Sequence, residues 1–365
     1  MTIGFLHQPN DPYTIVRMKY FISKGHRVIS ISFPQKDKKQ ETIKNLINIY
    51  LPELYLNRVF LLKRIIYFWH IFKITKDNDL DILHVVNAES MILSFFSMSR
   101  KVVIENQGSD VLYIPKQYPW VKFLYRLLYR FVDAVIQDSK VAQEAGIELG
   151  APIEFNEVIN IGIDFNIFNK NLEGGIARKK FNIDDEKIIF SSRGMKSIYN
   201  IDTIIKSIPS VREHFPNVKF IFASSYGEFS EDSNIFINQN NLQPNILYTG
   251  WLDHENEIPY LNMDADIVVS VPSTDSSPFS VYEAMATMTP VIASDLLWLK
   301  DKFIPGKDLI SVPVKDEFKL SEKIIELLKT PNVIDTKHAY RIVYDQINKD
   351  TENLKLEELY NALLI

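Results

Sequence analysis

A short stretch around residue 280 carries the residue types and spacing best suited to binding an anion. Ser277 is a good N-cap and Pro278 a good first helical residue, so the sequence predicts that a helix begins here. The first backbone N–H groups of a helix have no partner within it, and the helix dipole favours negative charge at that end. We therefore expect the N–H groups of Phe279 and Ser280 to face an anion such as a phosphate.

Two carboxylates flank this expected anion site. Glu283 follows Ser280 by three residues, so the two share one face of the helix, and Asp275 precedes the expected cap. One helical turn rises about 5.4 Å, roughly the step from a nucleotide's phosphate to its ribose hydroxyls. The pattern suits a sugar nucleotide, with its phosphates in the middle and hydroxyl-rich groups at both ends. It fits a capped amphipathic helix with two solvated acids equally well.

Apolar runs of strand length recur along the whole chain and alternate with helical stretches. A first series of expected strands comprises residues 2–7, 27–33, 81–87, 101–106, 134–139 and 154–160. A second series comprises residues 187–193, 218–224, 245–250, 267–271, 290–294 and 308–313, and the polar stretch 161–170 is a candidate linker. The sequence therefore predicts an α/β protein with two doubly wound, Rossmann-like domains facing across a cleft, with ligands at the carboxyl ends of the strands.

Length and composition agree with two domains and exclude several classes of protein. The chain has 365 residues, of which 46% are hydrophobic, and it has no cysteine, which excludes disulfides and thiolate metal sites. The N-terminus lacks a signal-peptide pattern, and no apolar run approaches the ~18 residues of a spanning helix, so we expect a cytoplasmic protein. Because the seven histidines show no ligand spacing, we expect no metal.

Two segments of the first half carry bases and no acids. Residues 58–76 and 116–130 interleave Trp, Tyr and Phe with Lys and Arg. This composition is typical of helices that lie on an anionic membrane surface, and it also fits core helices whose basic side chains reach past apolar stems to water. The chain as a whole has a net charge of −5 and no recognised nucleic-acid motif, so we expect no nucleic-acid partner.

Segments in order along the chain resemble the retaining glycosyltransferases of family 4 (glycosyl transferases group 1), which have the two-domain GT-B fold. They are KGHRVISIS, DILHVVNAE, QGSDVL, FVDAVIQDSKVAQE with VINIGIDFNIF, and SPFSVYEAMATMTPVIASD, of which the last is the most specific. The resemblance runs nearly end to end. It implies a first domain over residues 1–165, a second over 166–349, and a C-terminal helix over about 350–365 that packs back on the first.

The resemblance implies catalytic roles for three residues. Glu283 would hold the ribose hydroxyls of the donor, and Asp275, in place of the family's first paired glutamate, would bind hydroxyls of the transferred sugar. Arg193 would pair with the diphosphate, since a guanidinium can bind two oxygens at once. Phe279 and Ser280 would offer backbone N–H groups to the same diphosphate.

The remaining donor-side roles are also implied by the resemblance. Tyr199 and Asn200 stand where the family has Lys-Gly, which leaves Lys196 as the nearest base for a second phosphate contact. Gly250, Trp251 and Leu252 would shape the base pocket, or they would be only the end of a strand.

On the acceptor side, the resemblance places a set of residues at the cleft. Gln107 replaces a histidine of the family that approaches the donor sugar. Asn10 and Asp11 stand where the family has a double glycine, and would line the cleft or be ordinary turn residues. His84 would touch substrate or be a hydrogen-bonded structural histidine. Ser109 and Asp110 follow a glycine, and Asp110 would cap a helix or contact the acceptor.

The implied reaction is transfer of a sugar from a nucleoside-diphosphate sugar to a hydroxyl, with the anomeric configuration kept. It needs no protein nucleophile, because the departing phosphate oxygen takes the acceptor's proton. A glycan or lipid-linked acceptor of cell-envelope synthesis would suit an enzyme placed peripherally on the inner face of the membrane. A non-catalytic nucleotide-sugar or glycan-binding subunit and a sugar-nucleotide epimerase of similar fold are the alternatives.

Overall fold

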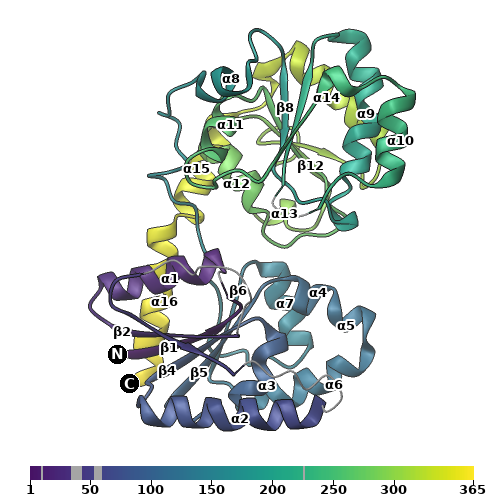
Figure 1. The fold of residues 1–365 in the computed structure, drawn as a ribbon. Helices are drawn as coiled ribbons and strands as arrows, with labels where there is room; N and C mark the ends of the chain where they lie inside the picture. The colour runs from purple at the N-terminus through teal and green to yellow at the C-terminus, as the bar shows by residue number, and fades with distance from the viewer. Residues whose placement is uncertain (10, 34–42, 53–59, 225–226) are drawn as a thin grey trace. The chain divides into compact units, whose positions relative to one another are not determined.

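A computed structural model describes residues 1–9, 11–33, 43–52, 60–224 and 227–365, with residues 12 and 60–64 described by their backbone only (Figure 1). Contacts divide the chain into unit 1, residues 1–161 with 350–365, and unit 2, residues 162–349. The first unit ends at residue 161, earlier than the boundary at 165 expected from the sequence. The reason is that Ile163 pairs with the chain near Asn348, which ties the start of the linker into unit 2.

Unit 1 is built on a seven-stranded parallel sheet in the order β3-β2-β1-β4-β5-β6-β7. Its strands are β1 (Thr2–His7), β2 (Arg27–Ser32), β3 (Leu46–Tyr50), β4 (Ile82–Val86), β5 (Lys101–Asn106), β6 (Ala134–Gln137) and β7 (Asn156–Val158). The apolar runs predicted six of these strands. They missed β3, which lies at the sheet edge, is partly exposed and carries a polar residue, so it lacks the continuous apolar pattern of a buried parallel strand.

Helices cover both faces of this sheet. They are α1 (Pro12–Ser23), α2 (Phe60–Asp77), α3 (Met91–Ser94), α4 (Ser109–Leu112), α5 (Ile114–Gln117), α6 (Pro119–Leu128), α7 (Lys140–Glu148) and α16 (Lys349–Leu364). One face packs on α1 and α16, where the ring of Phe21 stacks on that of Tyr360 with centroids 5.1 Å apart. The other face packs on α2, α3 and α6, with Ile71 and Tyr125 among its buried side chains.

Unit 2 has the same kind of architecture, with a six-stranded parallel sheet in the order β10-β9-β8-β11-β12-β13. Its strands are β8 (Ile188–Ser191), β9 (Lys219–Ala223), β10 (Ile246–Gly250), β11 (Ile267–Ser270), β12 (Val291–Ser294) and β13 (Ile310–Val312). Its helices are α8 (Ile176–Phe181), α9 (Ile201–His214), α10 (Glu231–Gln239), α11 (Ile258–Asp264), α12 (Phe279–Ala286), α13 (Leu299–Lys302), α14 (Glu317–Lys329) and α15 (Thr336–Gln346). The expected α/β class with two doubly wound sheets is confirmed.

Candidate functional site

In unit 2, the chain order along the sheet reverses at β8, which lies between β9 and β11. Doubly wound sheets bind ligands at the carboxyl ends of the strands at such a reversal. The loop after β8 carries Arg193, and the loop after β11 carries Asp275 and leads into α12. The sheet therefore places both predicted residues at the same edge.

Arg193 is the centre of the contacts at this edge. Its Nη2 forms an ion pair with the Asp275 carboxylate, and its Nη1 donates to Ser280 Oγ at 3.4 Å. The guanidinium carbon lies 4.5 Å from the centroid of the Tyr199 ring, which supports it from one side. Its Nε is buried and has no hydrogen-bond partner among the described residues. A buried donor left unpaired in this way favours an acceptor from a ligand.

The start of α12 differs slightly from the expected one. Pro278, not Ser277, is the N-cap, with an extended ψ of 92°, and the helix begins at Phe279. The reason is that Ser277 is held outside the helix, since its N–H donates to Asp275 Oδ1 at 3.3 Å. The Pro278 carbonyl accepts from the N–H groups of Val281 and Tyr282.

Glu283 lies one turn into α12 and has a partner that the sequence did not suggest. His254 Nε2 donates to Glu283 Oε1 at 2.7 Å, and the Glu283 side chain is 7% exposed against 62% for His254. Burial lowers the pKa of His254, but the carboxylates of Glu283, Glu255 and Asp253 raise it by more, so it lies above its ordinary value. The only hint in the sequence is that His254 shares a loop with Gly250.

The other predicted donor-side residues are placed as follows. Gly250 ends β10 with a φ of 69°, a conformation that favours glycine. Trp251 is 68% exposed, whereas Leu252 packs against the core of unit 2. Lys196 is exposed and precedes a short turn of helix. Asn200, at the position where the family has glycine, donates to the Val271 carbonyl at 2.9 Å and so ties α9 to the end of β11.

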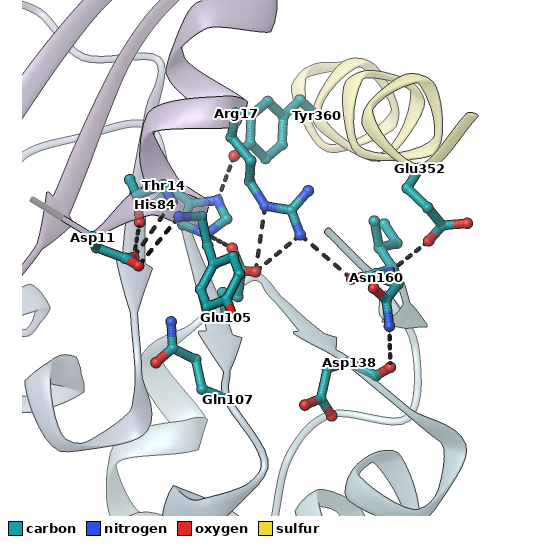
Figure 2. A network of polar contacts seen from close by, with 12 residues as sticks. Asp11, Thr14, Arg17, His84, Glu105, Gln107, Asp138, Asn160, Glu352 and Tyr360 are labelled. Carbon is teal, nitrogen blue, oxygen red and sulfur yellow. Dashed lines mark hydrogen bonds and ion pairs between the residues drawn. The ribbon is translucent and has the colours of Figure 1, made fainter. Parts of the chain in front are cut away.

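In unit 1, the structure gives the contacts of His84, for which the sequence left a substrate contact and a structural role open. His84 is fully buried, and both of its ring nitrogens are bonded, Nδ1 to the Tyr360 hydroxyl and Nε2 to Glu105 Oε2 at 2.8 Å (Figure 2). Burial lowers the pKa of His84, so the neutral ring donates to Glu105 and accepts from Tyr360. Arg17 Nη2 completes the network at 2.9 Å from Glu105 Oε1. His84 is therefore the hydrogen-bonded structural histidine.

Asp110, for which the sequence left a helix cap and an acceptor contact open, also forms bonds within unit 1. It is buried and accepts from the N–H of Ala88 at 2.8 Å and from the N–H of Gln107 at 3.1 Å. Burial raises the pKa of Asp110 to about 6, although these backbone donors lower it in part. Its carboxylate thus joins the loops that follow β4 and β5. The side chains of Gln107 and Ser109, in contrast, are exposed.

Asp11 is the N-cap of α1. Its carboxylate accepts from the N–H groups of Tyr13 at 3.3 Å and Thr14 at 3.4 Å, and from the Thr14 hydroxyl. Burial raises its pKa. Asp11 thus stabilises the start of α1, and Asn10 lies outside the described residues.

The two basic segments form helices that expose aromatic rings. Trp69 of α2 is 56% exposed, and Trp120 and Phe123 of α6 are 67% and 76% exposed. Lys73 Nζ lies 5.4 Å from the Trp69 ring centroid. Arg58 and the side chains of Lys63 and Arg64 lie outside the described residues. Over the described part of the chain, no helix is long and apolar enough to cross a membrane, and no cluster of three or more His, Cys, Asp or Glu could hold a metal.

Solved structures of glycosyltransferases share this fold. HepE of Anabaena in complex with UDP and glucose has a TM-score of 0.82 at 16% identity, covering 99% of this chain and 100% of its own. Sucrose-phosphate synthase of Thermosynechococcus elongatus has a TM-score of 0.82 at 17% identity, covering 100% and 99%. The lipopolysaccharide outer core galactosyltransferase WaaB has a TM-score of 0.70 at 9% identity, covering 99% of both chains. The fold is thus that of GT-B glycosyltransferases.

Family models define the protein more closely. The model of glycosyl transferases group 1 matches residues 175–344, and the model named glycosyl transferase 4-like matches residues 2–139. The chain belongs to the glycosyl transferases of group 1, which confirms the resemblance to that group, and it is a glycosyltransferase. No curated protein matches it in sequence.

Proposed function

We propose that this protein transfers a sugar from a nucleoside-diphosphate sugar to a hydroxyl acceptor, with the anomeric configuration kept, as in family 4. One observation carries the proposal. Arg193, Asp275 and Ser280 converge at the start of α12, with the Glu283 carboxylate one turn further along the same helix. Positive charge, hydroxyl-binding carboxylates and a helix start are what a nucleotide sugar requires.

The roles follow from the chemistry of each group. Arg193 would bind the diphosphate and stabilise the negative charge that grows on it as it leaves, with Lys196 as a second cation. Glu283 would hold the ribose, and Asp275 hydroxyls of the transferred sugar. The loop of Gly250, Trp251 and Leu252 would contact the base.

The chain's own residues would act by positioning and charge stabilisation, without a covalent intermediate. Asp275 is already paired with Arg193, and so is less available as a nucleophile. The leaving phosphate oxygen would accept the proton of the attacking hydroxyl on the same face of the sugar. No metal is required by this scheme, because Arg193 and the helix start supply the positive charge. Gln107 and Ser109, exposed beyond β5, are the proposed acceptor- or sugar-side residues of unit 1.

Uracil is the first base to test, because HepE of Anabaena was solved with UDP and glucose. A thermal-shift screen of nucleoside diphosphates and their sugars tests the site. A ligand present at a hundred times its dissociation constant adds about 2.7 kcal/mol of stability. Product analysis by NMR then reports the anomeric configuration. No shift with any nucleotide, or an inverted product, would overturn the proposal.

We propose that the acceptor is a glycan or a lipid-linked molecule of the kind used in cell-envelope synthesis. In α6, Val121 and Tyr125 face the core, while Trp120, Phe123 and Leu127 are exposed next to basic residues. A core helix with snorkelling bases would keep its aromatic rings inside, so this pattern supports contact with an anionic membrane surface. Flotation with vesicles that contain or lack phosphatidylglycerol tests it, since equal flotation with both would remove the membrane role.

A further inference from the structure

Hydrogen bonds within the loop that follows β10 hold its backbone, and the loop contacts α12 through His254. Asp253 Oδ1 accepts from the N–H groups of Glu255 and Asn256, each at 2.9 Å, and the N–H of Asp253 donates to Glu257 Oε2 at 2.6 Å. These bonds fix the backbone on both sides of His254. The His254 ring also packs against the buried Phe168, with ring centroids 5.2 Å apart.

His254 therefore reaches Glu283 from a fixed loop, and the bond joins two separate elements of unit 2. Its Nε2 occupies one carboxylate oxygen, Oε1, and leaves Oε2 without a side-chain partner among the described contacts. A carboxylate with one oxygen anchored has less rotamer freedom to lose when a ligand binds to the other. The bond also fixes the orientation of the carboxylate, so that its second oxygen can accept a bond from a hydroxyl group.

We propose that His254 is a positioning residue of the donor site, which anchors Glu283 for the ribose and couples the loop of Gly250–Leu252 to α12. The inference rests on the proposed function and deepens it. His254 acts through Glu283 and does not touch the reacting atoms. The charged groups that face His254 are Glu283 from α12 and Asp253 and Glu255 from its own loop, while the segment of Phe168 contributes an apolar ring.

The anchor should weaken with rising pH. The pKa of His254 is raised by these carboxylates, so the protonated form persists above its ordinary range and is lost as the pH rises through the raised value. In wild type, the KM for the nucleotide sugar should therefore rise toward alkaline pH, while kcat changes little.

Three variants test the inference. His254→Ala should raise the donor KM about tenfold, with a smaller effect on kcat, and should abolish the pH dependence of that KM. His254→Gln keeps a neutral donor and should restore part of the affinity with a flat pH profile. His214→Ala is the matched control, because His214 is also exposed in unit 2 but, among the residues that the structure describes, bonds to the Ser210 carbonyl of its own helix and to no carboxylate.

An independent measurement needs no nucleotide. Titration of His254 by NMR should give a lower pKa in Glu283→Gln than in wild type. An unchanged pKa there, or a His254→Ala enzyme with the wild-type KM and pH profile, would overturn the inference while leaving the donor site intact. If wild type binds no nucleoside diphosphate or its sugar at all, the proposed function itself fails, and the inference with it.

Discussion

Arg193 and Asp275 form an ion pair that joins the loops following two adjacent strands, β8 and β11. Both side chains are largely buried, with 14% and 13% of their surface exposed. A diphosphate that binds Arg193 must share the guanidinium with this carboxylate. The ion pair therefore fixes the direction of the guanidinium. We expect this ion pair to influence the affinity for the donor.

Arg193→Ala should lower kcat about a hundredfold. Removing one group that stabilises the charge of the transition state typically costs about 3 kcal/mol of barrier. Arg193→Lys should recover only part of the activity, because an ammonium keeps the charge but lacks the planar fork of donors. Steady-state kinetics with a nucleotide sugar, with circular dichroism as a check on folding, measures both. Wild-type turnover by Arg193→Ala would remove this residue from the site.

Asp110→Ala should release the loop that carries Gln107. The substitution leaves the buried N–H group of Ala88 and the part-buried N–H group of Gln107 without their acceptor, at a cost of about 1–3 kcal/mol for a buried unsatisfied group. Thermal unfolding should show a clear loss of stability. Ser109→Ala, an exposed neighbour in the same turn, should be close to neutral. If the two variants unfold at the same temperature, the link between the loops contributes nothing measurable.

Acid should destabilise unit 1 through Glu105. Burial raises the pKa of Glu105, but the charge of Arg17 and the bond from His84 lower it by more, to about 2. The folded-state pKa is thus below the unfolded one, so the stabilisation is present above about pH 4.5 and is lost as the pH falls from there toward 2. The expected loss is on the order of 3 kcal/mol.

Two further groups act at milder pH, with opposite signs. Burial lowers the pKa of His7 to about 4, so its protonation in the unfolded chain reduces stability between about pH 6.5 and 4. Asp110, with its pKa raised to about 6, stabilises the folded state as the pH falls from 6 to about 3.8. These two effects partly cancel, so the steep loss should come from Glu105 below pH 4.5.

Glu105→Gln checks this assignment by denaturant unfolding at several pH values. The variant should be about 3–5 kcal/mol less stable at neutral pH, because Arg17 remains buried without its ionic partner. Its stability should then change less between pH 4.5 and 3 than that of wild type. A wild-type slope in this range would assign the acid sensitivity to other groups.

Phe123→Ser combined with Trp120→Ser should reduce flotation with vesicles that contain phosphatidylglycerol, because it removes the two most exposed rings of α6. Phe318→Ser is a matched control, since Phe318 of α14 in unit 2 is 77% exposed and Phe123 is 76% exposed. The control should float like wild type. A similar loss for both variants would point to a general effect of exposed apolar surface.

The sequence by itself determined the fold class and most of its strands. Apolar runs such as Thr2–His7 and Lys101–Asn106 have the bounds seen in the structure, because the middle of a parallel strand that is covered on both faces is a run of apolar residues. It also placed Arg193, Asp275 and Glu283 near one sheet edge, since the carboxyl ends of parallel strands lie together.

Only the tertiary structure decided which side chains meet. His254 and Glu283 are 29 positions apart, and His84 and Tyr360 are 276 apart. No local pattern encodes such pairs, because the chain can return to any distant segment and the burial that favours a partner arises only on folding. For the same reason the sequence left the roles of His84 and Asp110 open. His84 bonds to Glu105 of β5 and to Tyr360 of α16, and Asp110 accepts from the N–H group of Ala88.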